Sequence, residues 1–476
     1  MSGLGNDAPP RPDADAIEAF TAHVTGTGYA DLSPVAVRSV KTFLLDTLGV
    51  GAAGSAGPFS ETLVQTQSAD GGAGGPARVW VHGTRLPAAG AALCNAYRIH
   101  NSEFDCVHEG AVVHTMTALT AACLAHAERA GTVDGRTLIT ALVLGVDVAC
   151  NLGIASRSAL RFFRPGTAGA FAATAGVGKL MGMDPETLKN AFGAALSQLC
   201  GTMQAHTEGS IVLGLQVGYN ARNAILACDM AELGLVAPHA VLEGPFGYFP
   251  LFEGDYDLGP ALESLGQVWR ITEVAHKPFP SGRATHGVLD AVLSLAREAA
   301  LEVPGIEQVT ARVPPLVAQL VGRPIQSVMT PNYARLCTAY CVARALPRGG
   351  LTVPDFAPEA LADPDTLALG ERVAIEIDGN PDPNALTPVS VTVRMRDGHE
   401  LSKTLGIVYG HPERPMSREA QLEKLSGNWA AAARPLPDEA RERLVETIDD
   451  LESCPDVGTL VDLLVPPCDA PPSARD

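Results

Sequence analysis

The stretch from Glu103 to His114, EFDCVHEGAVVH, concentrates side chains that are able to move protons. It contains three carboxylates, two imidazoles and one thiol, which belong to Glu103, Asp105, Glu109, His108, His114 and Cys106. Clustered acids and imidazoles shift one another's pKa values, as general acid–base catalysis requires. The stretch therefore predicts a proton-transfer site.

Three other interpretations of this stretch remain open. A metal site would use Glu103, Asp105 and His108, but neither an HExxH helix nor a Cys/His zinc spacing is present, so no metal is expected. A solvated loop would explain the polar residues but not the apolar flanks, ALCNAYRIH and TMTALTAACLAHAERAG. Cys106 near His108 is a weaker candidate for a nucleophile, and no GxSxG motif accompanies it.

Two isolated residues are candidates for substrate binding. Arg164 lies in LRFFRPGTAGAFAA, just before a run of small residues. An arginine at the start of such a helix can hold both oxygens of a carboxylate, although an exposed charge flanking the helix is an equal alternative. His206, in GTMQAHTEGS, is a second-tier candidate because a lone histidine is more often structural.

The segment 275–296, AHKPFPSGRATHGVLDAVLSLA, carries the most attractive group of cations in the chain. Four basic side chains and one serine surround the start of a predicted helix, namely His276, Lys277, Ser281, Arg283 and His286. A helix N-terminus and fixed cations together attract an anion, and a lysine in such surroundings can serve as a base. A solvated boundary loop between domains is the alternative interpretation.

Composition narrows the class of protein. The net charge of −19 and the pI of about 5.0 disfavour nucleic-acid and anionic-membrane partners. The 10 cysteines include no CxxC pair, so we expect reduced thiols in a cytoplasmic protein, and the polar N-terminus has no secretory signal. The apolar run Leu138 to Ala155 is interrupted by Gly145, Asp147 and Asn151, which indicates a buried helix rather than a membrane span.

The elements that position these residues change type along the chain. Helix signals dominate from about residue 15 to about residue 300, with Ser33 and Asp184 as expected N-caps, each followed by a proline. After Pro304, EQVTARV, RVAIEI and VSVTVRM alternate as strands do, and Asp397-Gly398 suits a hairpin turn. A helix is expected over 331–346, between the strands.

This pattern predicts a mainly α fold with a smaller α+β domain inserted near the C-terminus. The large all-helical domain would comprise residues 15–273 and, as a C-terminal return, 413–466. The α+β domain would cover 274–412. Residues 1–14 and 467–476 have the composition of disordered tails.

The ordered set of local signatures resembles the MmgE/PrpD family, which includes 2-methylcitrate dehydratases, cis-aconitate decarboxylases and an iminodisuccinate epimerase. The signatures include HNSEFDCVHEGAVVH, ALVLGVDV, FRPGTAGAFAATAGVGKLMGMDPE, LEGPFGYFPLF and HKPFPSGRATHGVLDA. The resemblance implies a helical domain and an α+β lid domain with the active site between them, usually in a homodimer. It also implies proton transfer beside a carboxylate of a di- or tricarboxylate, with no metal or organic cofactor.

The carry-over of family residues is partial. In place of the family motif D-F-D-D-T, Glu103 stands for the first aspartate, Asp105 keeps the second, and Cys106 and Val107 replace the rest. His114 matches the family histidine and Lys277 matches the later family lysine. Decarboxylase-like members have His-Pro where this chain has Arg164-Pro165, and a lysine near the position of Leu213.

From these observations we expect a cofactor-independent lyase, of hydro-lyase or decarboxylase type, that acts on a small anionic substrate. An isomerase, epimerase or cyclase of the same family is the alternative, and a metal-dependent hydrolase is a more distant one. His114 would be the base or acid, with Asp105 or Glu103 orienting it and His108 nearby, and Lys277 would be the second proton-transfer or oxyanion-stabilising group. The expected carboxylate-binding residues are Arg164, Ser281, Arg283, His286 and, second-tier, His206.

Overall fold

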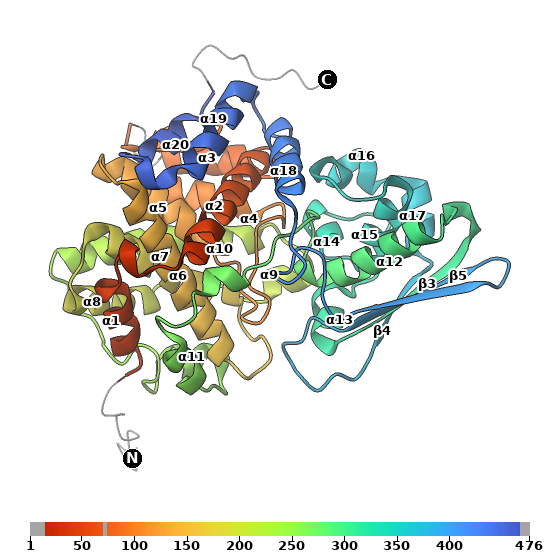
Figure 1. The fold of residues 1–476 in the computed structure, drawn as a ribbon, viewed down its shortest axis with the longest axis horizontal. Coiled ribbons are helices and arrows are strands. Elements are labelled where there is room, and N and C mark those ends of the chain that lie inside the picture. Colours follow the sequence, from red (N-terminus) through yellow and green to blue (C-terminus); the bar gives the residue numbers. More distant parts are fainter. Residues whose placement is uncertain (1–14, 70–73, 467–476) are drawn as a thin grey trace, which may run out of the picture.

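The computed structural model describes residues 15–69 and 74–466 (Figure 1). The two predicted disordered tails, 1–14 and 467–476, lie outside the described residues. The described part consists of a large helical body and a smaller α+β part beside it, so the mainly α fold predicted from the sequence is confirmed. The boundaries 274 and 412 between the two parts stay predictions.

The helical body is built from long, closely packed helices. They are α1 (Ile17–Gly26), α2 (Pro34–Gly54), α3 (Ser60–Ala69), α4 (Ala88–His100), α5 (Thr117–Ala130), α6 (Gly135–Ala155), α7 (Arg164–Met181), α8 (Pro185–Leu196), α9 (Gln204–Glu208), α10 (Val212–Glu232) and α11 (Gly259–Ser264). A two-stranded sheet, β1 (Ala77–Arg78) with β2 (Arg85–Leu86), interrupts them. The chain returns to this body at its end through α18 (Arg418–Ala430), α19 (Asp438–Asp449) and α20 (Gly458–Asp462) (Figure 1).

Local capping chemistry starts the helices where the sequence indicates. The Ser33 side chain accepts a hydrogen bond from the backbone N–H of Ala36, and Pro34 is the first residue of α2. Asp184 caps α8 in the same way by accepting from Glu186 and Thr187. A capped N-terminus of this kind satisfies backbone donors that the helix itself leaves free.

The α+β part contains a four-stranded sheet in the order β4-β3-β5-β6. Its strands are β3 (Ile306–Val313), β4 (Val373–Ile377), β5 (Val389–Met395) and β6 (Glu400–Leu405). β3 pairs in parallel with β4 and antiparallel with β5, and β5 forms an antiparallel hairpin with β6. The Asp397-Gly398 turn predicted from the sequence joins this hairpin, with Gly398 at φ +88°.

Helices cover the sheet and complete this part. α12 (His286–Glu298) packs against β5 and β6, and the buried side chains of Val389, Val391 and Val393 on β5 face the core. The remaining helices are α13 (Pro315–Val321), α14 (Pro331–Arg335), α15 (Thr338–Ala345), α16 (Pro358–Leu361) and α17 (Pro364–Gly370).

The helix predicted over 331–346 is wrong in one respect, because it is broken at Leu336 and Cys337. Cys337 has an extended conformation (φ −113°, ψ 100°) and pairs with Gly322. The break leaves the carbonyl of Arg335 free to accept a hydrogen bond from Gly282 at 3.0 Å. A tertiary contact to the 275–285 segment therefore replaces the helical hydrogen bonds at this point.

Among the described residues, α6 is long and apolar enough to span a membrane, and 94% of its apolar window is buried inside the protein. Its polar residues have partners in the core, since Asp147 lies 3.0 Å from His23 Nε2 and accepts from the backbone of Arg270. The helix is therefore a core element, as predicted.

Candidate active site

Two loops meet where the helical body faces the α+β part. The first follows α4 and carries Glu103, Asp105 and His114, and the second, 274–285, carries Lys277. Val107 and Ala275 exchange backbone hydrogen bonds of 2.8 and 3.1 Å and so join the two loops. Glu103 has φ +52°, a conformation that is costly for a residue with a side chain and that concentrates at functional sites.

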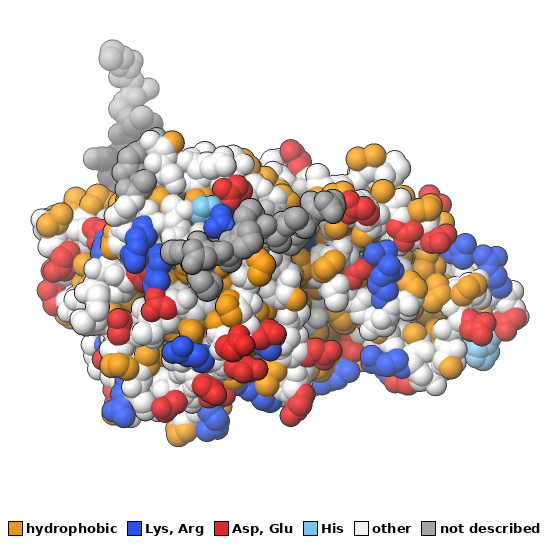
Figure 2. Space-filling model, turned by 90° about the horizontal axis from the view of Figure 1, so that it is seen from above, with side chains coloured by type: hydrophobic (Ala, Val, Ile, Leu, Met, Phe, Trp, Pro, Cys, Tyr) orange, Lys and Arg blue, Asp and Glu red, His pale blue; other side chains and the backbone are white. Residues whose placement is uncertain are grey.

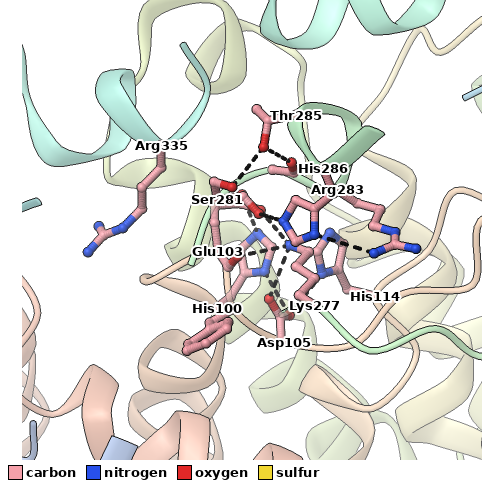
Figure 3. A network of polar contacts seen from close by, with 12 residues as sticks. His100, Glu103, Asp105, His114, Lys277, Ser281, Arg283, Thr285, His286 and Arg335 are labelled. Carbon is pink, nitrogen blue, oxygen red and sulfur yellow. Dashed lines mark hydrogen bonds and ion pairs between the residues drawn. The ribbon is translucent and has the colours of Figure 1, made fainter. Parts of the chain in front are cut away.

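Asp105 is the centre of the polar cluster (Figure 3). Its carboxylate is fully buried, and Oδ2 accepts hydrogen bonds from His100 Nδ1 at 3.0 Å and Thr117 Oγ1 at 2.5 Å. His114 Nδ1 lies 3.0 Å from the same oxygen. One buried carboxylate oxygen thus lies 3.0 Å from a nitrogen of each of two imidazole rings, which contact each other edge to face at a centroid distance of 4.7 Å.

Lys277 and Glu103 form a buried ion pair beside this carboxylate. The Lys277 ammonium donates to Glu103 Oε2 at 2.9 Å and to the Glu103 carbonyl at 3.2 Å, and it lies 3.9 Å from Asp105 Oδ1. His100 Nε2 lies 3.5 Å from the other oxygen of Glu103. The cluster is therefore a continuous alternation of acids and bases.

The surroundings keep both carboxyls ionised. Burial opposes the charge on Asp105, but the imidazoles of His114 and His100 outweigh burial and hold its pKa well below the usual range. Burial likewise opposes ionisation of Glu103, while Lys277, His100 and His114 lower its pKa to about 2. Both groups therefore act as fixed negative charges near neutral pH.

The pKa values of the two imidazoles are shifted in opposite directions. For His100, burial disfavours the cation, but Asp105 and Glu103 together raise its pKa. For His114, burial and the charge of Lys277 lower the pKa despite the opposing effect of Asp105. Titratable groups whose environments separate their pKa values are typical of acid–base sites, and the neutral histidine here is His114.

A small cavity opens next to His114. It is lined by Glu103, Val107, Val112, His114, Leu160, Phe163, Pro165, Met203, His206, Gly282, Arg283, Ala284, Leu320, Val321, Leu336 and Leu386. Because Nδ1 of His114 faces Asp105, its Nε2 is the ring nitrogen available to a molecule in the cavity. The fully buried Lys277 and Asp105 lie in the layer directly behind this wall.

Several predicted binding residues are near the cavity but already have partners. Arg283 lines it, and its guanidinium donates to the carbonyls of Tyr409 at 2.9 Å and His276 at 3.1 Å. Ser281 Oγ lies 2.7 Å from Thr285 Oγ1, and His286 Nε2 lies 3.2 Å from the carbonyl of Ser281. These contacts fix the start of α12 rather than expose its polar groups.

His206 lines the cavity from α9. Burial and the nearby Arg323 guanidinium lower its pKa to about 4. Arg323 also donates a 2.9 Å hydrogen bond to the His206 carbonyl. A neutral imidazole of this kind can accept a hydrogen bond from a ligand or donate one to it, and the second-tier binding role of His206 stays a prediction.

Two predicted site residues lie outside the cluster. Arg164 is buried in a two-pronged ion pair with Glu253, both nitrogen–oxygen distances being 2.9 Å, and it also donates to Ser156 at 3.0 Å. His108 Nε2 lies 3.0 Å from Glu273 Oε2. Neither side chain lines the cavity, and their predicted roles in the reaction stay predictions.

His100 is the site residue that the sequence reasoning missed. It is the last residue of α4 and was assigned to the apolar flank ALCNAYRIH. Its spacing of three and five residues from Glu103 and Asp105 was the available signal. That spacing gains meaning only because the chain turns sharply after the helix and brings all three side chains together.

The cluster also contains a set of metal-binding atom types. One donor atom each from His100, Asp105 and His114 lies within 4.8 Å of the other two, and two imidazoles with a carboxylate bind transition metals in many proteins. The ammonium of Lys277, 3.9 Å from Asp105 Oδ1, disfavours a further cation at this point.

Comparison with known proteins confirms the family resemblance. The MmgE/PrpD N-terminal domain model matches residues 18–261 and the MmgE/PrpD C-terminal domain model matches residues 279–450. Cis-aconitate decarboxylase of Homo sapiens is 29% identical over 94% of this chain and 95% of its own length. The proteins of that name from Mus musculus and Aspergillus terreus (strain NIH 2624 / FGSC A1156) are each 27% identical, over 94% and 93% of this chain and 93% and 94% of their own lengths.

Proposed function

Because the chain belongs to the MmgE/PrpD family, we propose that it is a lyase, of decarboxylase or hydro-lyase type, that acts on a small di- or tricarboxylate. The observation that carries this proposal is the position of His114. Its ring lines the cavity, while its Nδ1 lies 3.0 Å from the buried carboxylate of Asp105. A neutral imidazole held in this way has Nε2 ready to take a proton from a bound ligand.

The reaction begins with proton transfer at the carbon beside a carboxylate of the substrate. The proton moves from that carbon to Nε2 of His114, and the electron pair of the broken C–H bond becomes an enolate on the substrate carboxylate. Arg283, which lines the cavity, and Lys277, which is paired with the lining residue Glu103, would stabilise the enolate more than the ground state. The enolate then collapses in one of two ways. Either the neighbouring C–O bond breaks and the hydroxyl leaves with its electron pair, taking the proton from His114 to form water, or the proton returns from His114 to carbon. In a decarboxylation the C–C bond to the departing CO₂ breaks instead, its electron pair stays on the substrate carbon, and that carbon takes up a proton from solvent.

The names of the relatives support decarboxylation, while two positions favour an isomerase, epimerase or cyclase as the second candidate. The family places a histidine and a lysine where this chain has Arg164 and Leu213. Arg164 is paired with Glu253, and Leu213 is 1% exposed in the core, so neither supplies a proton to the cavity. A chain with fewer proton donors suits a reaction that returns a proton to the same carbon.

The proposed mechanism uses only side chains of this protein and no cofactor. The proposal also places the protein in the cytoplasm as a homodimer. We expect activity to survive exhaustive dialysis against a chelator and to show no increase on addition of Zn²⁺ or Fe²⁺. A metal-dependent hydrolase centred on His100, Asp105 and His114 would instead lose its activity under chelation.

The experiment that tests the proposal is the incorporation of solvent deuterium into a panel of small di- and tricarboxylates, followed by mass spectrometry. A proton-abstracting enzyme exchanges label even without net reaction. We expect His114→Ala to reduce exchange by about 10²–10⁴-fold, the usual contribution of a general base. The exposed His399 offers a matched control, since His399→Ala removes the same side chain at a position that does not line the cavity. Equal exchange by the two variants would contradict the proposal.

A further inference from the structure

The wall of the cavity is mainly apolar, which bears on the identity of the substrate. Of its sixteen lining residues among those described, four carry a polar side chain, namely Glu103, His114, His206 and Arg283. We infer that the substrate is a dicarboxylate that bears a hydrocarbon substituent, rather than a tricarboxylate. This inference rests on the proposed function and narrows it to one class of acid.

The charges at the polar end balance one another before any ligand binds. Lys277 is paired with Glu103, and Arg283 with Glu109 at 2.5 Å. Asp105 contributes one further negative charge, and the Nδ1 atoms of His100 and His114 each lie 3.0 Å from it. A buried carboxylate without a partner costs several kcal/mol, so each carboxylate of the substrate needs additional positive charge.

Two further arginines lie close to residues of the wall, since Arg335 directly precedes Leu336 and Arg323 contacts His206. Arg335 is buried, donates to the carbonyl of Asn101 at 3.1 Å and lies over the ring of Phe356. Arg323 donates to the carbonyl of His206 at 2.9 Å. Among the described residues, neither has a carboxylate within ion-pair distance, so together they offset two negative charges and leave none for a third.

Arg164 does not add to the number of cations that are available to the substrate. Arg164 directly precedes Pro165, which lines the cavity, but its guanidinium is bound on two sides by Glu253. Freeing it for a substrate would leave Glu253 buried, at 3% exposure, without its cation. The cost of breaking such a pair keeps Arg164 out of substrate binding.

The apolar side of the cavity is formed by both parts of the molecule. Leu160 and Phe163 come from the loop before α7, and Leu386 comes from the connection between β4 and β5. Asn384 Nδ2 donates to the carbonyl of Ser158 at 3.4 Å, which holds that connection against the helical body. Leu386 thus completes the surface against which the hydrocarbon substituent packs, and it is the specificity-determining residue of this inference.

The test uses three probes with one succinate core, namely succinate, 2-butylsuccinate and propane-1,2,3-tricarboxylate. Their affinities for the full chain are measured by calorimetry, and deuterium incorporation is followed for each. We expect 2-butylsuccinate to bind at least about tenfold more tightly than the tricarboxylate, because each buried methylene contributes about fourfold in affinity. A tricarboxylate that binds as tightly as 2-butylsuccinate would overturn the inference and leave the proposed function intact.

Substitutions of lining residues test where the hydrocarbon substituent packs. Leu386→Ala and, independently, Leu160→Ala are expected to lower the affinity for 2-butylsuccinate relative to succinate about fivefold or more, as loss of buried methylenes predicts. Ile377→Ala is the matched control, because Ile377 ends β4 just before the same connection and its side chain is 61% exposed. If the Leu386 and Ile377 variants behave alike, Leu386 is not part of the site. If the wild-type protein exchanges deuterium with none of the probes or the wider acid panel, the proposed function fails and this inference fails with it.

Discussion

At the scale of single residues, the site depends on one buried carboxylate that two histidines share. Both rings approach Asp105 Oδ2 at 3.0 Å, yet His100 is surrounded by two acids and His114 by one acid and the ammonium of Lys277. The difference in neighbours, rather than in distance, raises the pKa of His100, where Asp105 and Glu103 outweigh burial, and lowers that of His114, where burial and Lys277 outweigh Asp105. The same residue type is therefore shifted toward the cation at one position and toward the neutral form at the other.

This separation predicts the pH dependence of the reaction. The active form has a neutral His114, and burial together with Lys277 lowers its pKa below 6.5. The value of kcat/KM should therefore stay constant as the pH falls to 6.5 and decrease only at lower pH. Steady-state rates between pH 4.5 and 8.5 in buffers of constant ionic strength provide the measurement. A decrease that begins above pH 7 would show that His114 is not the base.

At the scale of elements, close backbone contacts between distant loops hold the reacting groups together. The segment that carries Lys277 receives support from the turn at Gly410, whose carbonyl accepts a hydrogen bond from His276 at 2.9 Å. Gly410 has φ +93°, and a Cβ built there would lie 2.4 Å from the carbonyl oxygen of His276. The turn is therefore compatible only with glycine, both in conformation and in space.

We expect Gly410→Ala to displace the neighbouring segment and to impair activity as well as stability. Its matched control is Gly398→Ala, since Gly398 has φ +88° but an added Cβ there meets no atom within 4 Å. The control should lose about 1 kcal/mol of unfolding free energy from backbone strain alone, with unchanged kcat. Gly410→Ala should lose at least about 2 kcal/mol and reduce kcat, measured by urea denaturation and turnover. Equal losses in the two variants would show that the contact to His276 is unimportant.

At the scale of the whole molecule, the site lies between the helical body and the α+β part of an acidic protein. The face of the molecule in Figure 2 carries acidic and basic side chains interspersed with hydrophobic ones. The net charge of −19 repels anions at a distance, whereas the cations that face the cavity lie in its interior. Several histidines are buried there as neutral groups, and burial lowers the pKa of both His206 and His276 to about 4. The stability of the fold and the charge of the site therefore both depend on the protonation of these buried histidines.

This burial predicts a loss of stability in mild acid. The folded-state pKa of His206 and His276 is lower than the ordinary value of 6.5, so the unfolded chain binds more protons between pH 6.5 and pH 4. The unfolding free energy should fall as the pH decreases through this window, by about 2 kcal/mol per histidine at pH 5. Denaturation curves at pH 7 and pH 5 measure this change. His276→Gln should reduce the difference, whereas His399→Gln, which alters an exposed residue, should not.

The sequence by itself determined the features that depend on neighbours along the chain. Helix starts at Ser33 and Asp184 follow from capping, and the alternation in VSVTVRM follows from the two faces of a strand. The spacing of acids and imidazoles between Glu103 and His114 likewise predicts a proton-transfer stretch, because such residues seldom enter a core without a reason. The family signatures then indicated the mainly α fold.

Only the tertiary structure decided which of these groups meet. His100 contacts Asp105 in the cluster, whereas Arg164 pairs with Glu253, 89 residues away in the sequence, and does not line the cavity. Leu386 entered the wall from the other part of the molecule, and the helix at Leu336 broke to contact Gly282. Burial and ion pairing are set by partners far apart in the sequence, and a one-dimensional pattern does not contain those distances. For this reason the residue types predict a class of chemistry, whereas long-range packing decides which of those residues lie together.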